Sequence, residues 1–281
     1  MVDAQQRPAE LPEVQRLEKQ LIVEQAGVKA IDILAEGVPL SRQKLKQAME
    51  KGAIWLNKSK GGRRRLRRAK TLLYKGDVLE LNYDAHILAA EPPLPRLIAD
   101  KQAYSVWYKP AKMLSQGSKF ADHCAITGWI EKNHEPRRTT YLVHRLDRAA
   151  SGLILIAHDR STAAKLSKLF STRKILKRYK VGIDGEFSGD LPIRIEVPLD
   201  GKAAESVILS SSIVDDQSEL TIEIKTGRKH QIRRHLSEQG WPVSGDKLYG
   251  DPGARGELKL KADYLSFICP LSGVLVTYQL D

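Results

Sequence analysis

The chain of 281 residues is long enough for one large and one small domain, and its hydrophobic content of 42% is ordinary for a folded protein. No segment approaches the roughly 20 consecutive apolar residues of a membrane span, and residues 1–20 carry acids and lack the apolar core of a secretory signal. We therefore expect a cytoplasmic protein that does not associate with a membrane.

The cysteines and histidines form no recognisable disulfide framework or metal site. Cys124 and Cys269 are the only two cysteines, and they belong to no CxxC pair. His230 and His235 stand five residues apart, so a helix would point them to different sides rather than toward one metal ion. We therefore expect neither a disulfide scaffold nor a bound metal.

The positive charge is concentrated in one part of the chain. The formal net charge is +12, and residues 41–80 hold 13 lysines or arginines against 3 acids, which places +10 in this segment. Such a segment attracts polyanions, and nucleic acid is the first candidate.

The N-terminal region predicts two short helices followed by a hairpin. Apolar spacing and Gly37 predict a first helix over residues 28–36. Ser41 as N-cap and Gly52 as the stop predict a second helix that ends at Lys51. Strand-like segments follow at residues 53–57 and 75–84.

The basic residues between the two predicted strands indicate an RNA contact. Like charges repel, so the run from Lys58 to Arg68 predicts a solvated loop, and a solubilising loop without a partner is the alternative. The segment SRQKLKQAMEKGAIWLN (41–57) resembles the small RNA-binding module first known from ribosomal protein S-four. The candidate RNA-binding residues are Lys44, Arg63, Arg64, Arg65, Arg67 and Arg68.

A proline-rich stretch separates this region from the rest of the chain. Residues 87–100 contain three prolines, each of which restricts its own backbone and that of the preceding residue. We interpret this stretch as an extended linker between a domain of residues 1–86 and a second domain of residues 101–281.

The second domain predicts more strand than helix. Short runs of β-branched and aromatic residues predict strands at 104–109, 152–157, 178–183, 205–210 and 219–225. Helical patterns lie between some of them, at 161–172 and 230–239. The pattern alone indicates the α+β class.

The segment HRLDRAASGLILIAHD (144–159) carries the strongest indication of chemistry. Its polar residues lead through Gly152 into an apolar run that predicts a buried strand, so Asp147 lies on a loop held against the core. This segment resembles the catalytic loop of the RluA-type pseudouridine synthase family, which reads HRLD followed by SGL. Further matches follow in the family's order: YKPA at 108–111, KRYKVGIDG at 177–185, GRKHQIRRH at 227–235 and SGDKLYG at 244–250.

The resemblance implies an enzyme that isomerises specific uridines of RNA to pseudouridine without a cofactor. The glycosidic bond is broken, the base turns within the site, and its carbon 5 is joined to the ribose. The resemblance implies Asp147 as the nucleophile, Tyr179 as the active-site tyrosine and Arg233 as the arginine that pairs with the aspartate. We further expect substrate or RNA contacts from Lys109, His144, Arg145, Arg228 and His230.

The chemistry of these side chains is consistent with the implied roles, but other roles for Asp147 and Tyr179 also fit the residues. A carboxylate is a nucleophile only when it is ionised, so Asp147 needs a neighbouring cation, which Arg233 would supply. Cations crowd the first half of the helix predicted over 228–239, which favours a nearby anion. From the residues alone, Asp147 also fits a surface ion pair. Tyr179 also fits a packed strand tyrosine, and its role in stacking or in acid–base chemistry stays open.

Two rival functions compete with this interpretation. An RNA-binding assembly factor without catalysis would be indifferent to the loss of Asp147. A hydrolase with paired carboxylates is disfavoured, because the predicted strand separates Asp147 from Asp159 by roughly 20 Å at about 3.3 Å per residue.

The resemblance also implies a mixed, largely antiparallel sheet in the catalytic domain. We expect a monomer that binds structured RNA, and the basic N-terminal module favours ribosomal over transfer RNA. Ala150 and Lys112 replace a threonine and a glycine that are common in the family. These departures bear on the local loop conformation and on the choice of RNA.

Overall fold

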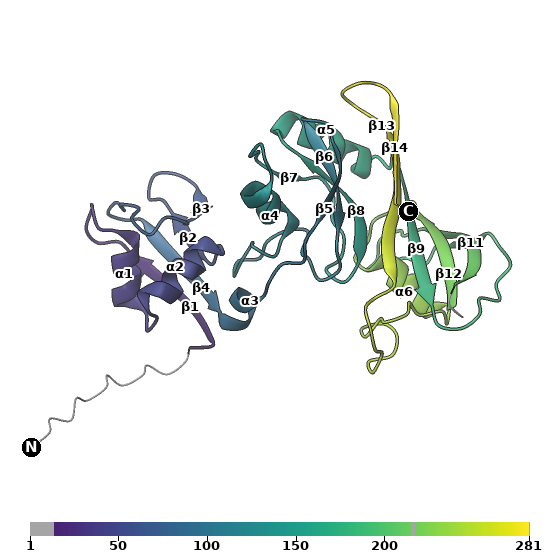
Figure 1. The fold of residues 1–281 in the computed structure, drawn as a ribbon, viewed down its shortest axis with the longest axis horizontal. Helices are drawn as coiled ribbons and strands as arrows, with labels where there is room; N and C mark the ends of the chain where they lie inside the picture. Colours follow the sequence, from purple (N-terminus) through teal and green to yellow (C-terminus); the bar gives the residue numbers. More distant parts are fainter. Residues whose placement is uncertain (1–13, 215–216, 281) are drawn as a thin grey trace, which may run out of the picture. The chain divides into compact units, whose positions relative to one another are not determined.

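The computed structural model describes residues 14–214 and 217–280, which form two compact units. One unit holds residues 14–91 and 117–123, and the other holds the remaining described residues (Figure 1). Residues 1–13 of the predicted N-terminal domain lie outside the described residues. Within the described ranges, no helix combines the length and the apolar character that crossing a bilayer requires.

The first unit is an antiparallel sheet with the strand order β1-β4-β2-β3 and helices packed beside it. Both predicted helices and both predicted strands form, and β1, which the sequence analysis did not predict, pairs with β4 along its whole length. The elements are β1 (Arg16–Ile22), α1 (Ala30–Gly37), α2 (Arg42–Glu50), β2 (Ile54–Asn57), β3 (Arg63–Arg65), β4 (Val78–Asp84) and α3 (Ala85–Ala89).

Local sequence explains the bounds of α2. The Ser41 side chain accepts a hydrogen bond of 3.2 Å from the backbone N–H of Lys44, which confirms the predicted N-cap. The buried stripe of α2 consists of Leu45, Ala48 and Met49. Gly52 follows the helix with a φ of +85°, a conformation that glycine adopts at little cost.

The predicted solvated loop over Lys58–Arg68 is wrong in its centre, because Arg63–Arg65 form strand β3 and pair with β2. The guanidinium carbons of Arg63 and Arg65 each lie 4.2 Å from the centroid of the Trp55 ring. Cation–π attraction of this kind offsets the like-charge repulsion on which the loop prediction depended.

The predicted linker over residues 87–100 is also shorter than expected. Helix α3 extends to Ala89, and residues Arg96–Asp100 form strand β5, which pairs with β6. The three prolines lie between these two elements. Strand β5 is an edge strand of its sheet, so the prolines that precede it remove no hydrogen bond between two internal strands.

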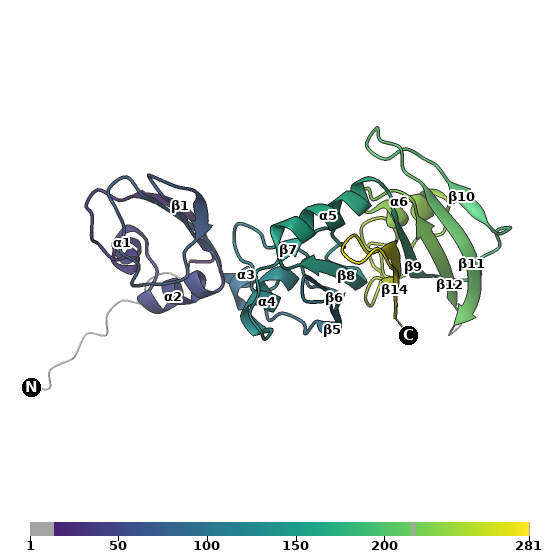
Figure 2. The ribbon, with the colours of Figure 1, turned by 90° about the horizontal axis from the view of Figure 1, so that it is seen from above.

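The second unit is built on a mixed sheet with the order β10-β11-β12-β9-β13-β8-β6-β5, to which β14 and β7 add beside β13 and β8 (Figure 2). Among the pairings of the described strands, only that of β13 with β8 is parallel, which confirms the α+β class and the largely antiparallel sheet. The remaining elements are β6 (Tyr104–Lys109), α4 (Ile126–Asn133), β7 (Tyr141–Leu142), β8 (Ser151–Ala157), α5 (Arg160–Ser171), β9 (Ile175–Ile183), β10 (Ile193–Ile195), β11 (Ser206–Val214), β12 (Gln217–Ile224), α6 (Gln231–Glu238), β13 (Leu260–Ile268) and β14 (Leu275–Gln279).

Strand β8 is the buried strand that the sequence predicted. Leu153 and Leu155 belong to one core cluster with Leu166 of α5, whereas Ile154 and Ile156 belong to another with residues of α4. Both faces of β8 are therefore covered, which explains its continuous apolar run. The strand is the rigid support behind the loop that carries Asp147.

Candidate active site

The loop of residues 143–150 presents Asp147 between β7 and β8. Leu146 and Ala150, on either side of it, are buried and anchor the loop to the core. The Ser115 hydroxyl accepts a hydrogen bond from the Leu146 N–H at 3.0 Å and donates one to the Leu146 carbonyl oxygen at 2.7 Å. This reciprocal pair immobilises the residue directly before Asp147.

Asp147 lines a cavity of about 330 Å³, and its side chain is 22% exposed. The walls of this cavity come from the 143–150 loop, from β9, from the segment around the start of α6, and from one end residue each of β12 and β13. They are formed by Arg145, Leu146, Asp147, Ala150, Tyr179, Ile224, Gly227, Arg228, Lys229, His230, Gln231, Ile232 and Leu260. The predicted residues Asp147, Tyr179, Arg145, Arg228 and His230 thus meet around one cavity.

Tyr179 lies in β9, opposite Ile222 of β12 and Ala262 of β13. It packs against two core clusters of the second unit. Burial raises the pKa of the phenol well above its ordinary value, and the negative charge of Asp147 raises it further. The Tyr179 hydroxyl is therefore protonated at neutral pH and is a donor rather than a phenolate.

Arg233 pairs with Asp246 and not, as predicted, with Asp147. Its Nε and Nη2 donate to the two carboxylate oxygens of Asp246 at 2.7 and 2.6 Å, and both side chains are buried. The hydrogen bonds to Asp246 raise the pKa of Arg233, with a smaller contribution from the charge of Asp147. The predicted partner was wrong because the Asp246 carboxylate is completely buried and binds the guanidinium through both of its oxygens.

The His230 ring lies beside Asp147, with its Nε2 3.8 Å from the Asp147 Oδ1. His230 precedes α6 in a left-handed conformation, with φ 54° and ψ 30°. Helix α6 begins at Gln231, so Arg228 and Lys229 lie outside the helix that was predicted to contain them. Of the cations predicted to crowd the start of the helix, only Arg233 and Arg234 lie within α6.

Two residues predicted to contact substrate, Lys109 and His144, instead bind groups within the protein. Lys109 is fully buried, and its ammonium donates to the carbonyl oxygens of Pro110, Met113 and Ala150 at 3.0, 2.8 and 2.7 Å. His144 stacks on the Phe170 ring at 4.3 Å, and its Nε2 accepts a hydrogen bond from a backbone N–H of β8. Both side chains hold the 143–150 loop in place.

The predicted RNA-binding arginines of the first unit divide into two groups. Arg65 and Arg67 pair with Asp122, at 2.9 and 2.5 Å, and Arg63 pairs with Glu80 at 2.6 Å. Among the described residues, by contrast, Arg64 and Arg68 are exposed and have no side-chain partner. Lys44 is half-buried on α2.

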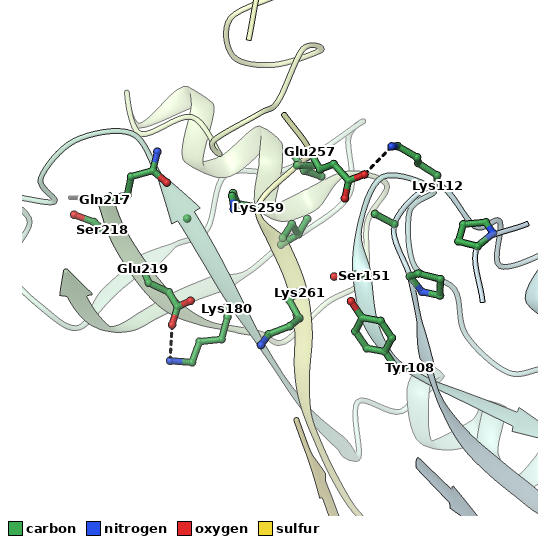
Figure 3. Close-up of a pocket in the computed structure, with 16 residues that line it drawn as sticks. Tyr108, Lys112, Ser151, Lys180, Gln217, Ser218, Glu219, Glu257, Lys259 and Lys261 are labelled. Atoms are coloured by element: carbon green, nitrogen blue, oxygen red, sulfur yellow. Dashed lines mark ion pairs between the residues drawn. The ribbon is translucent and has the colours of Figure 1, made fainter. Parts of the chain in front are cut away.

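A larger cavity of about 640 Å³ lies on the other face of the second unit's sheet (Figure 3). Tyr179 and Lys180 are consecutive in β9 and line different cavities, because alternate side chains of a strand point to opposite faces. In this larger cavity the carboxylates are already paired, Glu219 with Lys180 at 3.1 Å and Glu257 with Lys112 at 2.7 Å. Both carboxylates among the described residues that line it are therefore engaged with a lysine.

Sequence reasoning missed three residues around the Asp147 cavity. Ser115 binds Leu146, Asp246 binds Arg233, and the hydroxyl of Tyr249 lies 2.9 Å from the His230 Nδ1. The SGDKLYG segment (244–250) was noticed as a match, and it contains two of these residues. Ser115 lies in no matched segment, so no signal in the sequence pointed to it.

Comparison with known protein families identifies the second unit. Residues 103–238 match the family model described as RNA pseudouridylate synthase. A Bacillus subtilis protein named "Uncharacterized RNA pseudouridine synthase YjbO" is 34% identical over 235 residues, which cover 72% of this chain and 79% of that protein. The Escherichia coli "Dual-specificity RNA pseudouridine synthase RluA" is 28% identical over 190 residues, which cover 61% of this chain and 85% of that protein.

Two solved structures of human proteins have folds similar to that of this chain. "Human RNA Pseudouridylate Synthase Domain Containing 1" matches with a TM-score of 0.56 at 20% identity, covering 68% of this chain and 86% of that one. "Human RNA Pseudouridylate Synthase Domain Containing 4" matches with a TM-score of 0.54 at 20% identity, covering 66% and 88%. At this identity the likeness concerns the fold.

Proposed function

This chain belongs to the RNA pseudouridylate synthase family and is an RNA pseudouridine synthase, and we propose that Asp147 is its nucleophile and ribosomal RNA its substrate. The proposal that Asp147 is the nucleophile rests on one observation. Among the described residues that line the 330 Å³ cavity, Asp147 is the one carboxylate. Ligand pockets commonly have volumes of about 300 to 1,000 Å³, a range that accommodates a nucleoside.

The surroundings of Asp147 support a nucleophile rather than one of two paired carboxylates. Asp159, which with Glu135 is nearest to Asp147 among the acids in sequence, caps α5 and accepts hydrogen bonds from the N–H and hydroxyl of Thr162 at 2.8 and 2.7 Å. It is therefore occupied in a structural role. A hydrolase that needs two carboxylates about 5 to 9.5 Å apart is not supported.

The cavity walls suggest how the reaction proceeds. The Asp147 carboxylate would attack C1′ of the flipped uridine as the bond from C1′ to N1 breaks, leaving the base with its electron pair on N1. After the base turns, carbon 5 would attack C1′ as the bond to Asp147 breaks, and the proton lost from carbon 5 would be replaced by one gained at N1. The Tyr179 phenol, which stays protonated, would stack on the uracil or donate a hydrogen bond. Arg145 and Arg228 line the same cavity and would hold the phosphates beside the flipped nucleotide.

Flipping a base out of a helix costs a few kcal/mol, and the cost is least in loops and bulges. Contacts to the flanking backbone offset this cost, and the exposed Arg64 and Arg68 of the first unit would provide them. This basic unit favours ribosomal RNA as the structured substrate. Transfer RNA is the second candidate.

The nucleophile is tested with Asp147→Asn, which removes the negative charge and keeps the shape of the side chain. Conversion of uridine in purified RNA should fall by about a thousandfold or more, whereas RNA affinity should persist. Asp159→Asn is the matched control, because asparagine also caps helices and the site lies outside the cavity. Full activity of Asp147→Asn would remove Asp147 from the mechanism.

The substrate is tested by mapping pseudouridines in ribosomal and transfer RNA from cells with and without this protein. Loss of a ribosomal site alone would support the proposed substrate. Loss of a transfer RNA site alone would overturn it in favour of the second candidate. A protein that acted only in assembly would leave all pseudouridines in place.

A further inference from the structure

The His230 ring lies between the Asp147 carboxylate and the hydroxyl of Tyr249. Its Nε2 is 3.8 Å from the Asp147 Oδ1, and its Nδ1 is 2.9 Å from the Tyr249 hydroxyl oxygen. The two aromatic rings meet edge to face, with centroids 5.5 Å apart and an interplanar angle of 73°. One imidazole thus connects Asp147 to a tyrosine that does not line the cavity.

Tyr249 is held in this position from several directions. Its backbone N–H donates to the Asp246 Oδ1 at 3.1 Å, and its carbonyl oxygen accepts from the Ser237 hydroxyl. The Arg233 guanidinium, bound to Asp246, lies 5.0 Å from the centroid of the Tyr249 ring. The buried pair of Arg233 and Asp246 therefore fixes the tyrosine that contacts His230.

The two contacts of His230 determine which ring nitrogen carries the proton. Burial lowers the pKa of His230, and the nearby Arg233 and Lys229 lower it further, whereas Asp147 and Asp246 raise it. The imidazole is therefore neutral at neutral pH, with one N–H and one lone pair. A lone pair on Nε2 would face the Asp147 carboxylate, so the favourable arrangement has the Tyr249 hydroxyl donating to Nδ1 and the proton on Nε2.

We propose that Tyr249 is a positioning residue that acts through His230, holding the imidazole N–H toward the Asp147 carboxylate. This inference rests on the proposed role of Asp147 as the nucleophile. The distance of 3.8 Å is longer than a hydrogen bond in the free protein, and catalytic contacts of this kind commonly shorten when substrate binds. A neutral donor orients a carboxylate without neutralising the charge that nucleophilic attack requires.

The main test is Tyr249→Phe, which removes one oxygen atom and keeps the ring packed on His230 and Arg233. The single-turnover rate constant at saturating RNA should fall about 10- to 100-fold, as for other residues that orient a reacting group indirectly. RNA affinity and the thermal midpoint should stay at wild-type values. Tyr264→Phe is the matched control, because among the described residues the Tyr264 hydroxyl has no hydrogen-bond partner.

A double-mutant cycle separates positioning from a general packing effect. His230→Gln places an amide N–H close to the position of Nε2 without needing the Tyr249 hydroxyl, so it should retain part of the activity. In that background Tyr249→Phe should have no further effect on the rate. Independent, multiplicative losses in the two variants would overturn the proposal.

The protonation state is observable without activity. Two-bond ¹H–¹⁵N spectra of the intact protein, with the His230 signals assigned by their absence in His230→Gln, should show the proton on Nε2. A proton on Nδ1 would overturn the proposal. If Asp147→Asn is inactive and Tyr249→Phe is fully active, only this inference fails. If Asp147→Asn is active, the nucleophile itself is wrong.

Discussion

At the scale of single residues, the loop that carries Asp147 is held by buried polar groups whose hydrogen bonds are satisfied. Lys109 uses its three N–H groups on three carbonyl oxygens, and Ser115 both accepts from and donates to Leu146. Buried polar groups that are fully bonded favour one conformation over its alternatives. Asp147 is therefore presented by a preorganised loop.

His144 should make the stability of the protein depend on acid. Burial lowers the pKa of His144 from 6.5 to about 3, with a smaller effect of the Lys177 charge. Between these values the unfolded chain binds a proton that the folded chain does not, so the free energy of unfolding falls as the pH falls through this window.

In His144→Gln this contribution is absent. As the pH is lowered from 7 to 4, the free energy of unfolding should fall more in the wild type than in the variant. Urea denaturation of both proteins at each pH measures this difference. A constant difference between the two proteins over this range would show that His144 does not titrate as described.

Arg233 provides a second prediction at this scale, because its partner Asp246 is completely buried. Arg233→Gln leaves that carboxylate without its ionic partner and should lower the free energy of unfolding by about 3 to 5 kcal/mol. Arg234→Gln is the control, since its pair with the exposed Asp200 should have little effect on stability. Equal effects in chemical denaturation would contradict this account.

At the scale of elements, β8 and β13 meet where the active-site loop enters the sheet. Gly152 pairs with Ala262 of β13 in the parallel ladder and has a φ of +120°. A Cβ atom at Gly152 would overlap backbone atoms of Ala262. The glycine of the SGL motif is thus required by the close approach of a strand that lies more than a hundred residues later in the sequence.

Gly152→Ala should therefore lower the free energy of unfolding by more than the cost of a positive φ alone, because the added methyl group also overlaps β13. Positive φ at a non-glycine residue costs about 1 to 3 kcal/mol, and displacement of β13 adds to this cost. Gly185→Ala is the matched control, because Gly185 has a φ of +81° with open space around its Cβ position. Urea denaturation of both variants measures the difference, and equal losses would show that β13 accommodates the methyl group.

At the scale of the whole molecule, the concentration of charge in residues 41–80 is only partly available for RNA. Arg63, Arg65 and Arg67 are bound to carboxylates of the first unit, and two of them flank the Trp55 ring. Arg64 and Arg68 remain exposed. The arginine run therefore combines stabilisation of its own unit with a surface for phosphates.

Replacing Arg64 and Arg68 together by glutamine should weaken RNA binding and leave the rate at saturating RNA unchanged. The slope of log affinity against log salt should flatten by up to about 0.7 for each lost contact on single strands. A double replacement of Arg137 and Arg255, both exposed in the second unit, controls for net charge. Identical slopes in filter-binding titrations of the two variants would rule out a specific contact.

The sequence pattern alone predicted those features of the fold that depend on residues close together in the chain. The N-cap at Ser41, the buried strand from Leu153 to Ala157 and the α+β class all follow from periodicity and from neighbouring residues. The motif around Asp147 was likewise enough to indicate the family, because a short run of specific residue types is itself the signal.

The partners of charged groups could be decided only by the tertiary structure. Arg233 binds Asp246 rather than Asp147 because the fold brings the buried Asp246 carboxylate within hydrogen-bonding distance. The strand Arg63–Arg65 is stabilised by the contacts of Arg63 and Arg65 with the Trp55 ring. Strand β1 forms because β4 offers it an edge. Each of these outcomes depends on which groups the folded chain brings within a few ångströms, and electrostatic and packing energies vary steeply over such distances.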